Sequence, residues 1–320
     1  MKKILGNKKF HWLLKILFTL AFVYIINRNV LTKLGLLLDR LTWQYLGVAA
    51  IFSFGGLFFQ VKRWEIILRF QNFPVGGGVP WKTILWGNLL AFITPGRVGE
   101  LFRGLTIAEG RKADSLFAVV IDKLFIIFTV LWVGLLSIIS LKWLLHAHIS
   151  REVMIFLITA FFVCVTGMVI LMTGKVFDKK HVLSTYLSSI LENIPRLFNP
   201  AGKKAVGFSF AAHTCLMCQT VTLLSMFGCT DIVKSATAVG LAYGVMPFLS
   251  FTIGNMGVRE GAFSFFLSYL GAQVGIGTLS LQGASLGTSL VILIMNIVLP
   301  AFIGLVWYLL DNPRATIIKS

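Results

Sequence analysis

Long apolar runs separated by short polar gaps dominate this 320-residue chain. A helix needs about 20 mainly apolar residues to cross the hydrocarbon core of a bilayer. The first long run follows a basic tail like that of a signal peptide, but no small-residue cleavage pattern comes after it, which favours an uncleaved span. We therefore predict six membrane-spanning helices, at 12–30, 43–61, 115–141, 153–173, 205–227 and 284–310.

Two further regions, 81–108 and 235–271, are long and apolar but are interrupted near the middle by polar residues and glycines. The first interruption reads TPGRVGELFRG and the second reads TIGNMGVREGAF. Each predicts two half-length helices that meet at an unwound turn, and we interpret each region as a re-entrant hairpin. Two tilted full crossings, or glycine-rich turns at the membrane surface, are the alternatives that the sequence leaves open.

The distribution of positive charge predicts which ends of the spans face the cytoplasm. With a cytoplasmic N-terminus, 20 of the 29 lysines and arginines fall in cytoplasmic segments and six in external ones. Because cytoplasmic loops are enriched in these residues, we predict that both termini are cytoplasmic. The two broken regions then open from opposite sides of the membrane, which is the inverted-repeat arrangement of many transporters.

The predicted architecture is a single polytopic, all-α membrane domain over residues 1–320. Its first half, 1–174, contains the first broken region, and its second half, 205–320, contains the second. The polar segment 175–204 joins the halves. Its amphipathic middle predicts either a helix along the cytoplasmic membrane surface or a plain loop between the halves.

Composition supports a membrane protein and narrows the function. Apolar residues make up 57% of the chain and charged residues 13%, against about 25% charged in ordinary soluble domains. The net charge of +17 does not indicate nucleic acid, because the basic residues lie in short gaps rather than on one solvated face. The motifs of metalloproteases, serine hydrolases and P-loop proteins are absent, so we predict no enzyme, no cofactor and no metal. His213, alone in an apolar run, is expected to be a satisfied core histidine.

The charged residues at the first interruption are candidates for a functional site. A charge at the bilayer centre costs about 2.5–3.5 kcal/mol on insertion scales, so these side chains are expected to face a wet cavity or one another. Arg97, Glu100 and Arg103 follow at three-residue spacing, which places them on one helix face. They form either a self-neutralising ladder or a site for an anion, and a lipid phosphate is the anion that a membrane supplies.

The second interruption carries Asn255, Arg259 and Glu260. Adjacent helical residues point about 100° apart, so Arg259 and Glu260 are expected to find partners elsewhere. We expect Arg259 to meet Glu100, and Glu260 to meet an arginine of the first region, in a central pocket. Further polar residues in or beside the spans are expected to support this pocket, namely Asn88, Asp122, Lys123 and Asn296.

Two pairs of neighbouring residues have competing interpretations. Asp122 and Lys123 predict either a role in transport or a structural pairing with a neighbouring helix. Arg63 and Trp64 directly follow the second predicted span, and we expect them to snorkel to the cytoplasmic interface, with a functional role as the alternative.

The two interruptions resemble a known family. PGRVGE at 95–100 and GNMGVREGA at 254–262 are similar to two signature segments of the flippase-like membrane domain of bacterial lysylphosphatidylglycerol synthases. The resemblance extends over nearly the whole chain, in span count, spacing and the Arg-Trp pair after the second span. A third family segment reads acidic-basic-x-x-acidic. Asp122 and Lys123 match its first two positions, and Ile126 replaces its second acid.

The resemblance implies a domain that moves polar-headed lipids between leaflets, with the two hairpins forming the site. Synthase members also carry a soluble aminoacylating domain, which does not follow the last span here, so this chain is not expected to make the aminoacyl lipid. We hypothesise a flippase of the plasma (inner) membrane whose partner is a phospholipid or another lipid with an anionic or zwitterionic head group. Arg97, Arg103 and Arg259 would contact the phosphate, and Glu100 and Glu260 would neutralise them or hold a head-group amine.

Two rival functions stay open from the sequence. The first is a membrane-embedded lipid-modifying transferase, in which the charged turns would be catalytic. The second is a scaffold that binds lipid without transporting it. A homo-oligomer is compatible with each of the three functions.

Overall fold

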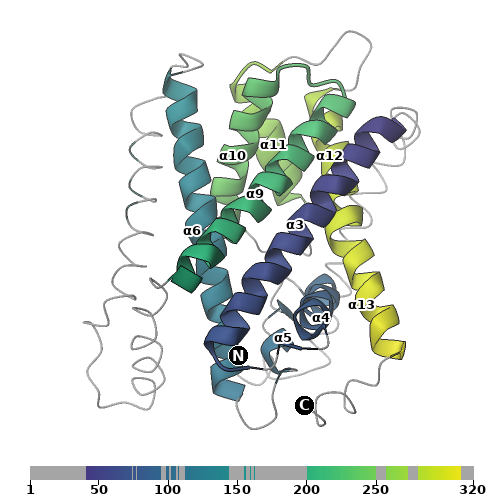
Figure 1. Ribbon diagram of the computed structural model, residues 1–320. Coiled ribbons are helices and arrows are strands. Elements are labelled where there is room, and N and C mark those ends of the chain that lie inside the picture. Colours follow the sequence, from purple (N-terminus) through teal and green to yellow (C-terminus); the bar gives the residue numbers. More distant parts are fainter. Residues whose placement is uncertain are drawn as a thin grey trace, which may run out of the picture. The chain divides into compact units, whose positions relative to one another are not determined.

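The computed structural model consists of helices joined by turns, without a β-strand among the described residues (Figure 1). This confirms the predicted all-α class. Contacts divide the chain into Met1–Thr42 and Trp43–Ser320, and all the helices named below belong to the second unit. The structure describes residues 41–73, 75–76, 78–94, 99–100, 102–105, 107, 112–143, 155, 159, 162, 200–249, 257–272 and 280–310.

Within the described residues, four helical runs are long and apolar enough to cross a membrane, and each overlaps a predicted span. They are α3 (Trp43–Phe70), α6 (Lys112–Trp143), α9 (Pro200–Met226) and the continuous run of α12 (Leu281–Leu293), a π-helical turn (Ile294–Val298) and α13 (Leu299–Leu310). The predicted spans 12–30 and 153–173 lie outside the described residues, apart from isolated positions in the second. The chain is therefore an integral membrane protein with at least these four apolar helices of spanning length.

Each broken region contains two separate helices, but their lengths are unequal and do not match the half-length pairs that the sequence predicted. They are α4 (Val79–Ile93) and α5 (Phe102–Leu105) in the first region, and α10 (Ile232–Leu249) and α11 (Val258–Tyr269) in the second. α4 has 15 residues and α11 has 12, fewer than the roughly 20 that cross a bilayer core. Gly257 precedes α11 with a φ of 82°, a conformation that glycine adopts readily and other residues adopt at a cost.

The helices pack in pairs that join distant parts of the chain. α3 lies along α9, α6 along α10, and α4 along α13 (Figure 1). α10 also packs against α11, and α11 against α12, so the second broken region contacts long helices on two sides. Small residues permit the closest approach. A Cβ added to Gly134 of α6 would lie 3.3 Å from the Cα of Gly244 of α10.

Gly304 of α13 faces the backbone of α4 at close range. A Cβ added there would lie 2.6 Å from the carbonyl oxygen of Leu85, and a helix backbone cannot move aside as a flexible side chain can. We expect Gly304→Ala to lower the free energy of unfolding by about 1–3 kcal/mol through overpacking. Thermal unfolding of the protein in detergent measures the effect. Gly47→Ala is the matched control, because nothing lies within 4 Å of its added Cβ. Equal unfolding midpoints for the two variants would contradict this packing.

Candidate functional site

Asp122 of α6 lies at the centre of a buried ion-pair network. Its side chain is fully buried. One carboxylate oxygen accepts a hydrogen bond from Nε of Arg63 at 2.6 Å, and the other accepts from Nη2 of Arg103. A buried carboxylate is costly unless it is both paired and hydrogen-bonded, and the two guanidinium groups meet that requirement. Asp122 therefore joins α3, α5 and α6.

Arg63 does not snorkel to the membrane surface, so this prediction was wrong. α3 continues to Phe70 instead of ending at residue 61, which places Arg63 inside the helix. Its side chain is only 3% exposed, and besides Asp122 it contacts Ser209 of α9, with Nη1 donating to Oγ at 3.4 Å. The ion pair with Asp122 offsets the cost of withdrawing the guanidinium from water, so the helix does not need to end there.

An aromatic ring and a glycine shape the surroundings of Arg103 on α5. The central guanidinium carbon lies 4.3 Å from the ring centroid of Trp64, which is a cation–π contact. The indole N–H of Trp64 in turn donates to Oγ1 of Thr83 at 2.8 Å. A Cβ on Gly87 of α4 would lie 3.0 Å from the Arg103 side chain, so the glycine leaves room for it. α3 and α4 thus fix the position of this guanidinium.

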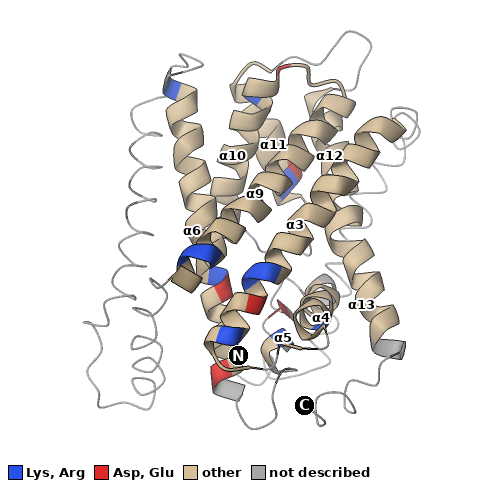
Figure 2. Cartoon of the chain, in the orientation of Figure 1, with Lys and Arg blue, Asp and Glu red and all other residues tan. Residues whose placement is uncertain are grey.

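Glu100 and Lys123 form the more accessible pair of this charged cluster, with Nζ of Lys123 donating to Oε2 of Glu100. Glu100 is buried, whereas 33% of the Lys123 side chain is exposed. The backbone N–H of Gly99, the residue before Glu100, donates to Oγ1 of Thr94 at 2.6 Å. Figure 2 shows basic and acidic segments of α3 and α6 gathered beside α5. Lys123 is therefore partly exposed at this pair, while Asp122 is fully buried.

Arg259 occupies the first turn of α11 in the second broken region. It is 4% exposed, and it donates to Oγ of Ser289 and, from Nη2, to the Ser289 carbonyl oxygen at 2.8 Å. The neighbouring Glu260 points back and accepts from the backbone N–H of Gly257, which caps the start of the helix. A buried arginine is therefore held between α11 and α12.

The structure brings the predicted site residues together in two groups rather than in one pocket. Glu100 and Arg103 join the two residues expected only to support the site, Asp122 and Lys123. The sequence had suggested that Arg259 meets Glu100, but Arg259 bonds Ser289 and Glu100 bonds Lys123. Glu260 was expected at an arginine of the first region and instead caps α11. Asn88 is buried on α4, and Arg97 and Asn255 lie outside the described residues.

Asn296 is part of a polar cluster that the sequence had not indicated. It lies in the π-helical turn of the last span and exchanges hydrogen bonds with Gln219 of α9, at 2.7 Å and 3.2 Å. The hydroxyl of Ser53 on α3 donates to the same Asn296 oxygen at 2.6 Å. Gln219 is fully buried. A glutamine inside the apolar run 205–227 is the sequence signal that could have identified it. π-helical turns inside α-helices frequently occur at functional sites.

The amide pair leads to a testable expectation. Gln219→Leu removes one partner and leaves the Asn296 side chain short of hydrogen bonds, so we expect a loss of about 1–3 kcal/mol in the free energy of unfolding. The double variant Gln219→Leu/Asn296→Leu removes both polar groups and should recover part of that loss. Thermal unfolding in detergent measures both variants. A double variant less stable than Gln219→Leu alone would contradict the pairing.

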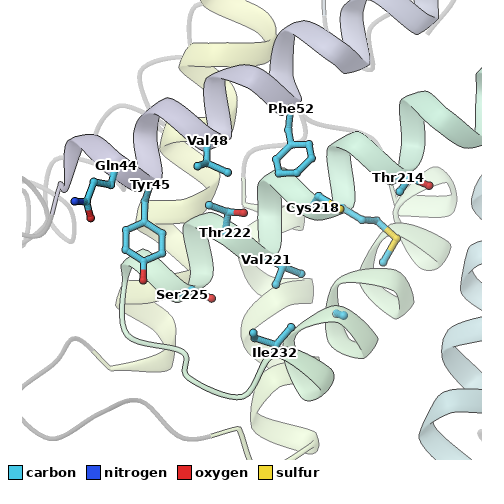
Figure 3. A pocket seen from close by; sticks show the side chains of 12 residues that line it. Gln44, Tyr45, Val48, Phe52, Thr214, Cys218, Val221, Thr222, Ser225 and Ile232 are labelled. Carbon is cyan, nitrogen blue, oxygen red and sulfur yellow. The ribbon is translucent and has the colours of Figure 1, made fainter.

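A groove of about 790 Å³ lies between the first half of α3, the second half of α9 and the start of α10 (Figure 3). Its lining is mostly apolar and includes Tyr45, Phe52 and Val221. None of the charged residues described above lines it. The groove is therefore separate from the candidate site.

No group of three histidine, cysteine, aspartate or glutamate side chains suited to a metal ion occurs within the described ranges. Residues 12–300 match the family model described as the lysylphosphatidylglycerol synthase TM region. Searches of curated proteins and of solved structures found no match to this chain.

Proposed function

Because this chain belongs to the family of lysylphosphatidylglycerol synthase TM regions, a family tied to membrane lipids, we propose that it is a flippase that moves a phosphate-bearing polar lipid between leaflets. One observation carries the proposal. Each broken region places a buried arginine on its shorter helix, Arg103 on α5 and Arg259 on α11. Buried cations within membrane segments are costly and mark pathways for ions or polar substrates.

The pair of Lys123 and Glu100 supplies an exchange step at the first region. A lipid phosphate reaching the exposed part of Lys123 can replace Glu100 as its partner, because both are anions that accept from an ammonium group. The released Glu100 carboxylate can then hold a head-group amine. Arg103, fixed by Asp122 and Trp64, keeps the surroundings positive while these partners change.

Arg259 supplies the second cation. Its guanidinium is a planar fork of N–H donors, which matches phosphate oxygens, and Ser289 fixes its orientation. The start of α11 adds the positive end of the helix dipole, which favours an anion, and the Glu260 carboxylate is the anion that accepts from its Gly257 N–H in this structure. Both regions thus offer the chemistry that a phosphate head group requires.

The short helices support the re-entrant arrangement that belongs to this proposal. α4 and α11 fall short of a bilayer crossing, as expected for hairpins that turn back within the membrane. In the proposed topology both termini are cytoplasmic in the plasma membrane, and the two hairpins open from opposite sides as inverted repeats. The head group would pass between them while the acyl chains stay in the lipid.

Reconstitution into liposomes with fluorescently labelled phosphatidylglycerol tests this function against its two rivals. A flippase accelerates transfer between leaflets and leaves the lipid chemically unchanged. A lipid-modifying transferase yields a product of altered mass, which mass spectrometry of the extracted lipids detects. A scaffold binds the lipid without either effect. Vesicles that show no accelerated transfer of any lipid of the native membrane would overturn the flippase proposal.

A further inference from the structure

His213 of α9 is the one histidine among the described residues. Its side chain is 8% exposed, and its Nε2 atom is buried without a hydrogen-bond partner in the described part of the chain. The expectation of a satisfied core histidine was therefore wrong. Burying an unpaired polar nitrogen is costly, and an apolar side chain could fill the same space without that cost. A packing role alone does not account for this residue.

His213 shares one face of α9 with two buried hydroxyl residues. Ser209 precedes it by four residues and Thr220 follows it by seven, which are spacings of a single helix face. Ser209 is 2% exposed and Thr220 is fully buried. The Ser209 hydroxyl accepts from Arg63 at 3.4 Å, so this face begins at the ion-pair network.

The other end of this face leads to the second broken region. Thr220 shares a hydrogen bond of 2.9 Å with the hydroxyl of Tyr243 on α10, and the Tyr243 ring meets the His213 ring edge to face at 5.5 Å. Tyr243 also packs edge to face against Phe263, one helical turn after Arg259 on α11. Residues of α9 and α10 therefore lie between Arg63 at one end and Phe263, one turn after Arg259, at the other.

The charged and titratable groups along this face come from four helices. They are Arg63 from α3, Asp122 from α6, Tyr243 from α10 and Arg259 from α11. α12, which also packs against α9, has no titratable residue. Asp122 pairs with Arg103 of α5 as well as with Arg63, so Arg63 at the Ser209 end is a paired charge rather than an isolated one.

We propose that His213 is a proton-binding site that couples lipid movement to a proton gradient. The inference rests on the proposed function, because the coupled cargo is the lipid head group that moves between Lys123 and Arg259. The lone pair of Nε2 accepts a proton from water on one side, and the imidazolium releases it to water on the other as the exposure of the site alternates. Burial disfavours the imidazolium in this conformation, and a histidine that reaches water changes its charge near physiological pH, so the step requires the alternating exposure.

Proteoliposomes loaded with the pH dye pyranine and containing labelled phosphatidylglycerol test the proposal. A pH step across the membrane should drive the labelled lipid away from an equal distribution between leaflets in wild-type vesicles, with proton entry reported by pyranine. His213→Gln is expected to lose both responses to the pH step. Cys218→Ser is the control, because Cys218 is on the same helix but lines the apolar groove (Figure 3), and it should behave as wild type.

The outcomes separate this inference from the proposed function. Lipid transfer by the wild type that ignores the pH step would overturn proton coupling and leave the flippase intact, whether or not the variant folds. An equal response of wild type and His213→Gln would also overturn it. Proton entry that is lost in His213→Gln without any lipid transfer would keep the proton site and remove the flippase function. If proton entry into wild-type vesicles is no faster than into protein-free vesicles, the proposed proton site at His213 is wrong.

Discussion

Asp122→Asn is expected to be the most destabilising single substitution in the charged network. The variant leaves Arg63 and Arg103 buried without the carboxylate that pairs with both. Removing one partner of a buried ion pair costs about 3–5 kcal/mol, because the remaining charge is uncompensated in a low dielectric. A loss of that size is a large part of the stability of a typical domain, which is about 5–15 kcal/mol. We therefore expect little folded protein to survive extraction.

The yield of monodisperse protein after detergent extraction, together with its thermal unfolding midpoint, measures the effect of Asp122→Asn. Asp114→Asn is the matched control, since Asp114 lies on the same helix but is exposed. We expect the control to stay close to wild type. If both variants unfolded at the same temperature, Asp122 would not hold α3, α5 and α6 together.

Arg259→Gln is expected to cause the largest functional loss among substitutions at the second broken region. Glutamine retains a hydrogen-bond donor for Ser289 but removes the positive charge and the forked N–H groups. A hydrogen bond to a charged group contributes about 1.5–3 kcal/mol, and each 1.36 kcal/mol corresponds to about tenfold in rate. We expect lipid transfer to slow by roughly 10- to 100-fold.

The rate of transfer of labelled phosphatidylglycerol in liposomes checks Arg259→Gln. Arg259→Lys keeps the charge without the planar fork and should retain an intermediate rate. Lys234→Gln, a partly exposed lysine at the start of α10, controls for a general loss of positive charge. Transfer rates that are equal for Arg259→Gln and Lys234→Gln would remove Arg259 from the proposed site.

The helices could be predicted from the sequence because each depends on a local pattern. A run of about 20 apolar residues is long enough to predict a membrane-spanning helix. The structure places α6 and α9 within a few residues of the predicted bounds. The two interruptions could also be predicted from the sequence, because their glycines and charged residues break the apolar pattern of a membrane helix. The error at the end of α3 has the same origin. Arg63 looks like the end of a span, because its neutralising partner lies 59 residues away in the sequence.

The pairing of the site residues could not be predicted, because it depends on which helices pack together. Glu100 and Arg103 are close in sequence, yet each pairs with a residue of α6. Glu100 pairs with Lys123, and Arg103 pairs with Asp122. Spacing along one helix reveals which of its residues share a face. It does not reveal which residues of another helix that face contacts. The same reason hid the bond of Arg259 to Ser289 and the amide pair of Asn296 and Gln219.

The charged cluster divides its residues between two roles. Asp122 is sealed between guanidinium groups and stabilises the fold, while Lys123, its neighbour in sequence, is partly exposed and suited to ligand exchange. Adjacent residues on a helix point in different directions, so under the proposed function one short stretch of α6 would serve both roles. The structural pairing that the sequence offered for Asp122 is present, and the transport role of Lys123 is part of the proposal.

The accessibility of labelled phosphatidylglycerol to an added quencher tests the central claim most directly. In liposomes that contain the wild-type protein, label in the inner leaflet should become quenchable far faster than in protein-free liposomes. The folded double variant Lys123→Gln/Arg259→Gln, which lacks a cation at each broken region, should match the protein-free rate. If the wild type does not exceed the protein-free rate, or if the double variant transfers lipid as fast as the wild type, the two cations do not form a lipid pathway.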